Sequence, residues 1–329
     1  VLDAVRDPAG FDVLVVELSS HQLWYLSLAG GAGALSPHAS VCLNLADDHL
    51  EWHGSFRAYR DAKAVVYRNT RVACVYNKSD DATREMVEEA EVIEGCRAIG
   101  FDLGVPGPSD VGLVDGILVD RAFLEDRRTS ALELTTVADL AVRGLAAPHI
   151  VANTLAAAAL ARSLDVAPEA VARALGEFRL DPHRIEIVAV AAGITWIDDS
   201  KATNPHAANS AMQAYDSFVW IAGGQAKGTT FDDLVARYRD RMRGAVVIGV
   251  DRQLIAETLA RHAPDVPVRV LDNPHTDVMD EVVALAGAMA QPGDTVLLSP
   301  GCASLDMFDG YAARGERFAD WHTDIKGNN

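Results

Sequence analysis

Short apolar runs alternate with helical patterns along almost the whole of this 329-residue chain. Residues 11–18 and 40–45 are apolar runs of the kind that form buried parallel strands. Residues 55–70 carry apolar side chains at spacings of three and four, which indicates an amphipathic helix. The alternation predicts an α/β fold. A chain of this length is too long to fold around a single hydrophobic core of ordinary size, so we expect two domains.

The best domain boundary is the Leu-Asp-Pro stretch at residues 180–182, which predicts domains at 1–180 and 181–329. Before it, Asp115-Gly116 between apolar flanks is a strong hairpin signal. After it, the alternation restarts as a doubly wound α/β pattern. Further strands are expected at 72–77, 185–190, 195–198, 218–222, 245–250, 268–271 and 295–299. Further helices are expected at 80–90, 149–163, 168–178, 205–215, 231–242, 252–262, 277–290 and 305–318.

The formal net charge of -18 excludes some classes of partner. A surface this acidic repels nucleic acid and anionic membranes, and an anionic substrate would need local cations or a divalent metal. No charge-free run of 18 apolar residues is present, so we expect no membrane span. The four cysteines form no CxxC pair, which fits a reducing cytoplasm.

In the first domain, three polar positions interrupt apolar surroundings. Glu17 ends a predicted strand, and it is either a metal ligand or a surface carboxylate. Asp48 and His49 follow the next predicted strand and form either a cation site or a solvated loop. Lys63 lies on the apolar stripe of its helix. There a lowered amine pKa would permit a carbamate, unless the side chain reaches water.

In the second domain, three polar or glycine-rich clusters fall at predicted carboxyl ends of strands, where open α/β sheets bind ligands. They are DDSKATN at 198–204, GGQAKG at 223–228 and SPGCASLD at 299–306. Each is either an anion site before a helix or an ordinary strand-to-helix turn, with Thr203 or Asn204 as a helix cap. None is a Walker loop, because GxxxxGK[ST] is absent from the chain.

The ordered set of motifs resembles the Mur ligases over nearly the whole chain. The most specific segments are ELSSHQL at 17–23, DHL at 48–50, YRDAK at 59–63, PHR at 182–184, DSKATN at 199–204 and LSPGCASLD at 298–306. The resemblance implies a central mononucleotide-binding-type parallel-sheet domain, incomplete at its start, and a C-terminal Rossmann-like α/β domain. It is closest to the members that add D-glutamate.

The resemblance also implies roles for individual residues. Glu17, His49 and Lys63, the last as a carbamate, would be catalytic and would serve Mg²⁺ sites. ATP would be contacted by Asn153, Arg184 and Asp199. D-glutamate would be held by Lys201, Thr203, Lys227, Ser304, Leu305 and Tyr311. Visible departures are His149-Ile150 in place of His-Asn, Asp198 in place of Asn, His21 in place of Phe, and Tyr311 in place of Phe.

The implied reaction is ATP-dependent ligation of D-glutamate to UDP-N-acetylmuramoyl-L-alanine through an acyl phosphate, in cytoplasmic peptidoglycan precursor synthesis. The implied cofactors are ATP and Mg²⁺, and the full-length enzyme would be a monomer. The family places a uridine-nucleotide domain and a GTxGKT/S phosphate loop before the position of Glu17, where only 16 residues stand. We therefore expect an N-terminally truncated chain that is inactive and folds poorly alone.

Two other interpretations stay open. The chain could be another Mur ligase or a folylpolyglutamate synthase, although the short final domain favours the D-glutamate enzyme. It could also be a non-catalytic module that retains a D-glutamate pocket. A Rossmann-type dehydrogenase is disfavoured, because no GxGxxG follows a predicted strand.

Overall fold

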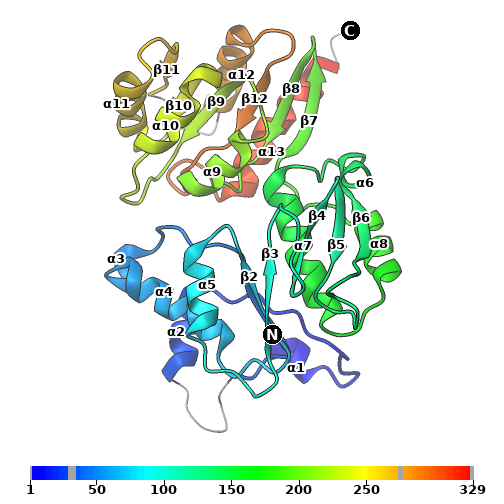
Figure 1. The fold of residues 1–329 in the computed structure, drawn as a ribbon. Helices are drawn as coiled ribbons and strands as arrows, with labels where there is room; N and C mark the ends of the chain where they lie inside the picture. Colours follow the sequence, from blue (N-terminus) through cyan, green and yellow to red (C-terminus); the bar gives the residue numbers. More distant parts are fainter. Residues whose placement is uncertain (1, 29–34, 273–276, 327–329) are drawn as a thin grey trace. The chain divides into compact units, whose positions relative to one another are not determined.

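The computed structural model describes residues 2–28, 35–272 and 277–326. The chain divides into two compact units, Val1–Phe178 and Arg179–Asn329, and each is built around a six-stranded sheet (Figure 1). The predicted α/β class is therefore confirmed. No helix within the described ranges is both long and apolar enough to cross a bilayer.

The sheet of the first unit has the strand order β1-β2-β3-β4-β5-β6. Strands β1 to β4 are parallel, β5 is antiparallel to β4, and β6 is antiparallel to β5. At the predicted hairpin, Asp115 and Gly116 both have positive φ (49° and 80°), which suits the tight turn between β4 and β5. The strands are β1 (Ala39–Cys42), β2 (Ala73–Asn77), β3 (Arg97–Phe101), β4 (Asp110–Val114), β5 (Ile117–Asp120) and β6 (Leu132–Thr136).

Helix α7 (Pro148–Arg162) is the central helix of this unit and packs against β1 to β4. Its Ala-rich sequence lets the helix lie close to the sheet, and Pro148 suits its first turn. Side-chain caps start other helices, as at Ser55 and Asp80. The other helices are α1 (Leu2–Arg6), α2 (Ser20–Leu28), α3 (Leu50–His53), α4 (Phe56–Ala64) with the 3-10 turn η2 (Val65–Tyr67), α5 (Asp81–Glu88), α6 (Val137–Ala141) and α8 (Pro168–Glu177).

The strand predicted at residues 11–18 is wrong. These residues form no strand, and the apolar side chains are exposed, with Val15 at 91%. An apolar run forms a strand only where a neighbouring strand receives its backbone hydrogen bonds. Residues 11–18 make no ladder hydrogen bond with any described residue.

The sheet of the second unit has the order β11-β10-β9-β12-β8-β7, and only β7 is antiparallel to its neighbour. Its strands are β7 (Glu186–Ala191), β8 (Ile194–Asp198), β9 (Phe218–Gly223), β10 (Met242–Ile248), β11 (Val268–Val270) and β12 (Thr295–Leu298). Its helices are α9 (Pro205–Met212), α10 (Asp232–Tyr238) with the 3-10 turn η3 (Arg239–Arg241), α11 (Arg252–His262), α12 (Val278–Met289) and α13 (Tyr311–Lys326).

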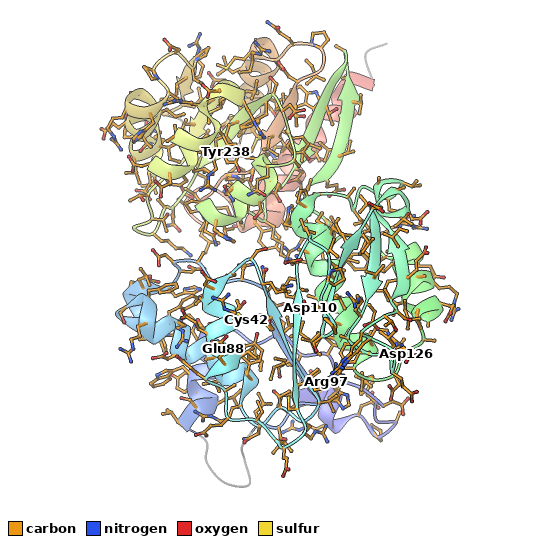
Figure 2. All side chains as sticks on the ribbon, in the orientation of Figure 1. Cys42, Glu88, Arg97, Asp110, Asp126 and Tyr238 are labelled. Carbon is orange, nitrogen blue, oxygen red and sulfur yellow. The ribbon has the colours of Figure 1, made fainter. Side chains whose placement is uncertain are left out.

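Helices cover both faces of this second sheet. Trp220 of β9 packs in one core with residues of α9, α10 and α11, including Tyr238, which is labelled in Figure 2. Val219 and Ile221 point to the other face and pack with residues of α12 and α13. Because successive side chains of a strand alternate between faces, a fully buried strand such as β9 needs a helical layer on each side.

The helix predicted at 305–318 begins later, at Tyr311. Residues 304–310 instead form turns, in which the backbone N–H groups of Met307 and Phe308 both donate to the carbonyl of Ser304. Gly310 has a φ of 150°, which is not helical. The predicted helix therefore loses its first turn and a half, and the residues after β12 stay as a loop.

Candidate functional site

In the second unit, the three clusters that the sequence places at strand ends come together. Strands β9, β12 and β8 are neighbours and parallel, so the loops that follow them leave the same edge of the sheet. Backbone hydrogen bonds join these loops, from Gly301 to the carbonyl of Ala202 (2.9 Å) and from Gly223 to that of Pro300 (2.9 Å). The result is one continuous polar edge.

Two glycines allow the loops to approach this closely. A Cβ atom on Gly223 would lie 1.9 Å from the carbonyl oxygen of Ile248, and one on Gly224 would lie 2.1 Å from that of Ala303. Both glycines also have positive φ, which side-chain-bearing residues rarely adopt. Gly223, the last residue of β9, and Gly224, which follows it, are therefore required by backbone packing.

Arg314, in the first turn of α13, ties the loops together. Its guanidinium is fully buried and donates to the carbonyl and hydroxyl oxygens of Ser200 (2.8 and 2.9 Å) and to the carbonyl of Cys302 (3.2 Å). A weaker contact reaches the carbonyl of Gly223 (3.4 Å). Burial lowers the pKa of Arg314 to about 10, so the group stays charged at neutral pH. Sequence reasoning missed Arg314.

Asp199 is a buried carboxylate at the centre of this edge. It accepts a hydrogen bond from the hydroxyl of Ser299 (2.7 Å), whose carbonyl in turn accepts one from the indole of Trp220 (2.8 Å). Burial raises the pKa of Asp199 to about 7, against the lowering effects of its hydrogen bonds and of exposed Arg184. A carboxyl that titrates near neutrality is typical of functional sites.

Lys201 is partly buried beside Tyr311. Its ammonium lies 5.3 Å from the centre of the Tyr311 ring and 3.6 Å from the carboxylate of Asp181, which is mostly exposed. Thr203 is partly buried, whereas the side chain of Asn204 caps α9 by accepting from the N–H of Ala207 (2.8 Å). The structure thus brings Lys201 and Tyr311 into contact.

The other predicted amino-acid ligands lie on the neighbouring loops. Ser304 is buried after β12, and Leu305 beside it is 69% exposed. Lys227 is exposed after β9 and has a φ of 52°, in the left-handed region. These residues flank the same edge of the sheet as Lys201.

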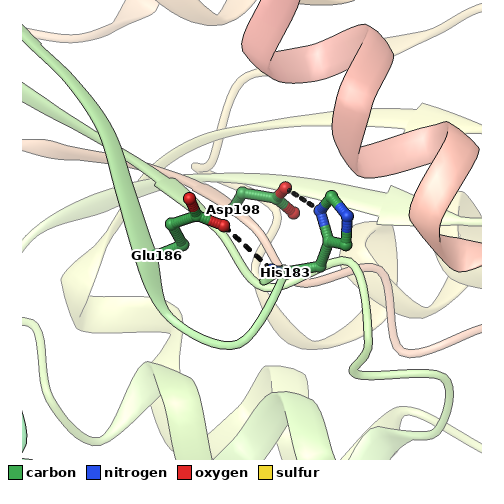
Figure 3. Close-up of side chains that lie close together, drawn as sticks. All are labelled: His183, Glu186 and Asp198. Carbon is green, nitrogen blue, oxygen red and sulfur yellow. Dashed lines mark hydrogen bonds and ion pairs between the residues drawn. The ribbon is translucent and has the colours of Figure 1, made fainter. Parts of the chain in front are cut away.

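Next to Lys201, His183, Glu186 and Asp198 form a hydrogen-bonded group (Figure 3). The Nδ1 atom of His183 lies 2.6 Å from the carboxylate of Asp198, and the backbone N–H of His183 donates to Glu186 (3.0 Å). Burial raises the pKa of Asp198, and the bond to His183 opposes the shift. The spacing of the three side chains would suit a metal ion. However, Nδ1 of His183 already bonds to Asp198, and the nearest oxygens of Asp198 and Glu186 accept hydrogen bonds from this ring or from backbone N–H groups. The sequence motif contained His183 but no signal for this pairing.

In the first unit, aromatic rings and imidazoles gather where α2 meets α3. The ring of His21 lies 4.8 Å from that of His49 and 4.5 Å from that of Trp52. The Nε2 atom of His53 is 3.0 Å from the hydroxyl of Ser20. Burial, together with the charges of His21 and His49, lowers the pKa of His53. The carboxylates of Asp48 and Glu51 each lie 3.8 Å from His49.

The predicted metal ligands of this unit, Glu17, His49 and Lys63, form no hydrogen bond or ion pair with one another. Glu17 is exposed, and it forms no hydrogen bond or ion pair with His49, Lys63 or any other described residue. Lys63 is partly buried on α4. Burial raises the pKa of the Cys42 thiol, and the positive charge of Lys63 partly opposes this increase. Asn153, the predicted ATP ligand, is exposed on α7.

Comparison with known proteins gives a consistent result. The middle domain of Mur ligases matches residues 2–161, and the Mur ligase glutamate ligase domain matches residues 183–302. UDP-N-acetylmuramoylalanine–D-glutamate ligase of Leifsonia xyli is 60% identical over 97% of this chain, which spans 62% of that relative. The enzyme of the same name from Streptomyces avermitilis is 55% identical over 97% of the chain and 67% of the relative.

Solved structures support the fold. The crystal structure of UDP-N-acetylmuramate-alanine ligase MurC from Thermotoga maritima is similar with a TM-score of 0.60 at 19% identity, over 93% of this chain and 63% of that one. The structure of MurF ligase from Thermotoga maritima in complex with ADP has a TM-score of 0.54 at 15% identity, over 89% and 64%.

Proposed function

Because the chain belongs to the Mur ligase family, we propose that it takes part in ATP-dependent ligation of D-glutamate to UDP-N-acetylmuramoyl-L-alanine, in cytoplasmic synthesis of peptidoglycan precursors. The names of the relatives support this reaction. The structural observation that carries it is the polar edge of the second unit. There Lys201, a partly buried cation, lies between an aromatic ring and an exposed carboxylate.

The second unit would bind the amino acid. Lys201 and Lys227 would neutralise its carboxylates, and the carboxylate of Asp181 beside Lys201 would give way to one of them. Ser304 and Thr203 would supply hydroxyl groups, and the exposed side chain of Leu305 and the ring of Tyr311 would flank the aliphatic part of the substrate. This donor set of two ammonium groups and two hydroxyls fits an acidic amino acid.

ATP would contact Asn153, Arg184 and Asp199. Mg²⁺ would be held by Glu17, His49 and, as a carbamate, Lys63, and it would stabilise negative charge on the phosphates. The donor set fits a divalent cation, because Glu17 is a carboxylate without an ion pair among the described residues, and His49 has two further carboxylates near it.

We also propose that these 329 residues do not catalyse ligation by themselves. The sequence contains no GxxxxGK[ST] loop, whose backbone N–H groups and lysine would hold the ATP phosphates. A phosphate-release assay with ATP, Mg²⁺ and both substrates checks this proposal. Product formation by the chain alone would contradict it.

The amino-acid site is tested separately, by calorimetric titration of the chain with D-glutamate in the absence of ATP and Mg²⁺. We expect D-glutamate to bind in preference to L-lysine, diaminopimelate and L-alanine. The variant Lys201→Met should bind D-glutamate at least about tenfold more weakly, since it loses a charged hydrogen bond. The matched control Lys78→Met removes an ammonium that pairs with Asp110 in the first unit, and it should bind normally. Equal binding by Lys201→Met would refute the site.

A further inference from the structure

His183 is held in an unusual backbone conformation. Its φ is 66°, in the left-handed region that residues other than glycine rarely occupy. The surroundings hold it there, because its N–H donates to Glu186 (3.0 Å) and its carbonyl accepts from the N–H of Lys201 (3.1 Å). The backbone of His183 is thus tied directly to that of Lys201.

The imidazole ring is fixed as firmly as the backbone. Its Nδ1 atom lies 2.6 Å from one oxygen of Asp198, whose other oxygen accepts from the N–H of Ser200 (2.9 Å). Gly315 of α13 packs against the pair, since a Cβ atom there would lie 2.3 Å from Nδ1. An ionised carboxylate can only accept a hydrogen bond, so the contact with Asp198 favours the tautomer that carries its proton on Nδ1, and in that tautomer Nε2 has a lone pair.

This lone pair is free for a ligand. Nε2 has no hydrogen-bond partner among the described residues and is not sealed from solvent. In Figure 3 the Nε2 atom lies on the side of the ring away from Asp198. The centre of the imidazole lies 6.2 Å from that of the Tyr311 ring, and the ammonium of Lys201 lies 5.3 Å from the same ring. An oriented acceptor and a cation therefore both lie near the same aromatic ring.

A zwitterionic amino acid offers complementary groups, because a carboxylate suits Lys201 and an ammonium suits an imidazole acceptor. We propose that His183 recognises the ammonium group of the amino-acid substrate through Nε2, with Asp198 and Gly315 as the positioning residues that fix its tautomer and direction. The inference rests on the proposed function of the second unit and adds the residue that distinguishes an amino acid from a plain dicarboxylate.

The test compares D-glutamate with glutarate, which has the same two carboxylates and no ammonium. Calorimetry on the 329-residue chain should show D-glutamate binding roughly tenfold or more tightly, as expected for one charged hydrogen bond. In His183→Asn the preference should fall to about threefold or less. Asparagine tolerates positive φ, and its amide can still donate to Asp198, so the variant should keep its fold. Thermal unfolding checks this.

A matched control is available in the same unit. His262 at the end of α11 also bonds to an aspartate, Asp232 at 2.7 Å, and His262→Asn should leave the preference unchanged. Long-range ¹H–¹⁵N spectra should show His183 protonated at Nδ1, and this signal should be absent from His183→Asn. An undiminished preference in a folded His183→Asn, or protonation at Nε2, would overturn the inference alone. Binding of neither compound by the unaltered chain would overturn the proposed amino-acid site and the inference with it.

Discussion

Replacing Gly315 with alanine should destabilise the second unit, although alanine is the better helix former. Gly315 lies inside α13, where the exchange by itself would favour folding by about 1 kcal/mol. The new Cβ atom would lie 2.3 Å from Nδ1 of His183 and 2.4 Å from an oxygen of Asp198. Ordinary contacts begin near 3.4 Å, so the buried pair would have to separate or move.

Three effects set the magnitude. Crowding a packed interior costs about 1–3 kcal/mol, and loss of a charged hydrogen bond costs about 1.5–3 kcal/mol. The gain in helix propensity offsets about 1 kcal/mol of this, so we expect a net loss of about 1.5–5 kcal/mol in the free energy of unfolding. For a unit of this size that lowers the melting temperature by roughly 3–20 °C.

Differential scanning calorimetry of the whole chain measures this change, and a second helical glycine provides the control. Gly176 lies in α8 of the first unit, and a Cβ atom there would meet nothing within 4 Å. Gly176→Ala should therefore stabilise the protein by about 0.5–1 kcal/mol. If Gly315→Ala melts at or above the temperature of the unaltered chain, the close packing of α13 against the His183–Asp198 pair is refuted.

Three further predictions concern stability. The pKa of Asp199 is about 7 in the folded chain against an ordinary 3.8, so the folded state binds more protons between these values. The free energy of unfolding should therefore fall with rising pH by at most about 1.4 kcal/mol per unit over that window, and urea midpoints of Asp199→Asn should lack this slope. Arg314→Met should cost about 3 kcal/mol or more in urea unfolding, because buried carbonyls lose their donor, and an unchanged midpoint would contradict the network. Gly116→Ala should cost about 1 kcal/mol, since φ there is positive, whereas Asp115→Asn should be neutral by the same measurement.

Much of the fold could be predicted because its periodic patterns are local. The helix predicted at 252–262 has those bounds in the structure, and the hairpin at Asp115-Gly116 forms as its turn residues require. The strand at 11–18 failed because strand formation depends on a partner that a local pattern cannot reveal. Strand β3 was not predicted for a related reason. Its pattern is short, and the neighbouring β2 and β4 decide its state.

The residues of the candidate site likewise include some that the sequence could predict and some that it could not. Lys201 and the glycines after β9 could be found because they follow apolar strands, and strand ends meet at one edge of a parallel sheet. Arg314 could not be found, since an arginine in an amphipathic helix usually faces water and nothing local marks this one as buried. The pairing of His183 with Asp198 joins residues on either side of strand β7, and no glycine or asparagine marks the positive φ at position 183.

The way Arg314 holds its neighbours has a consequence for how this scaffold can change over time. Most of its bonds go to main-chain carbonyls, which every amino acid possesses. Exchanging the residues at 303–305 would therefore alter the side chains that the loop presents to a ligand, while the hydrogen bonds from Arg314 to the carbonyl of Cys302 that fix the loop backbone remain. New ligand selectivities could therefore arise here by single substitutions that leave the backbone of the loop unchanged.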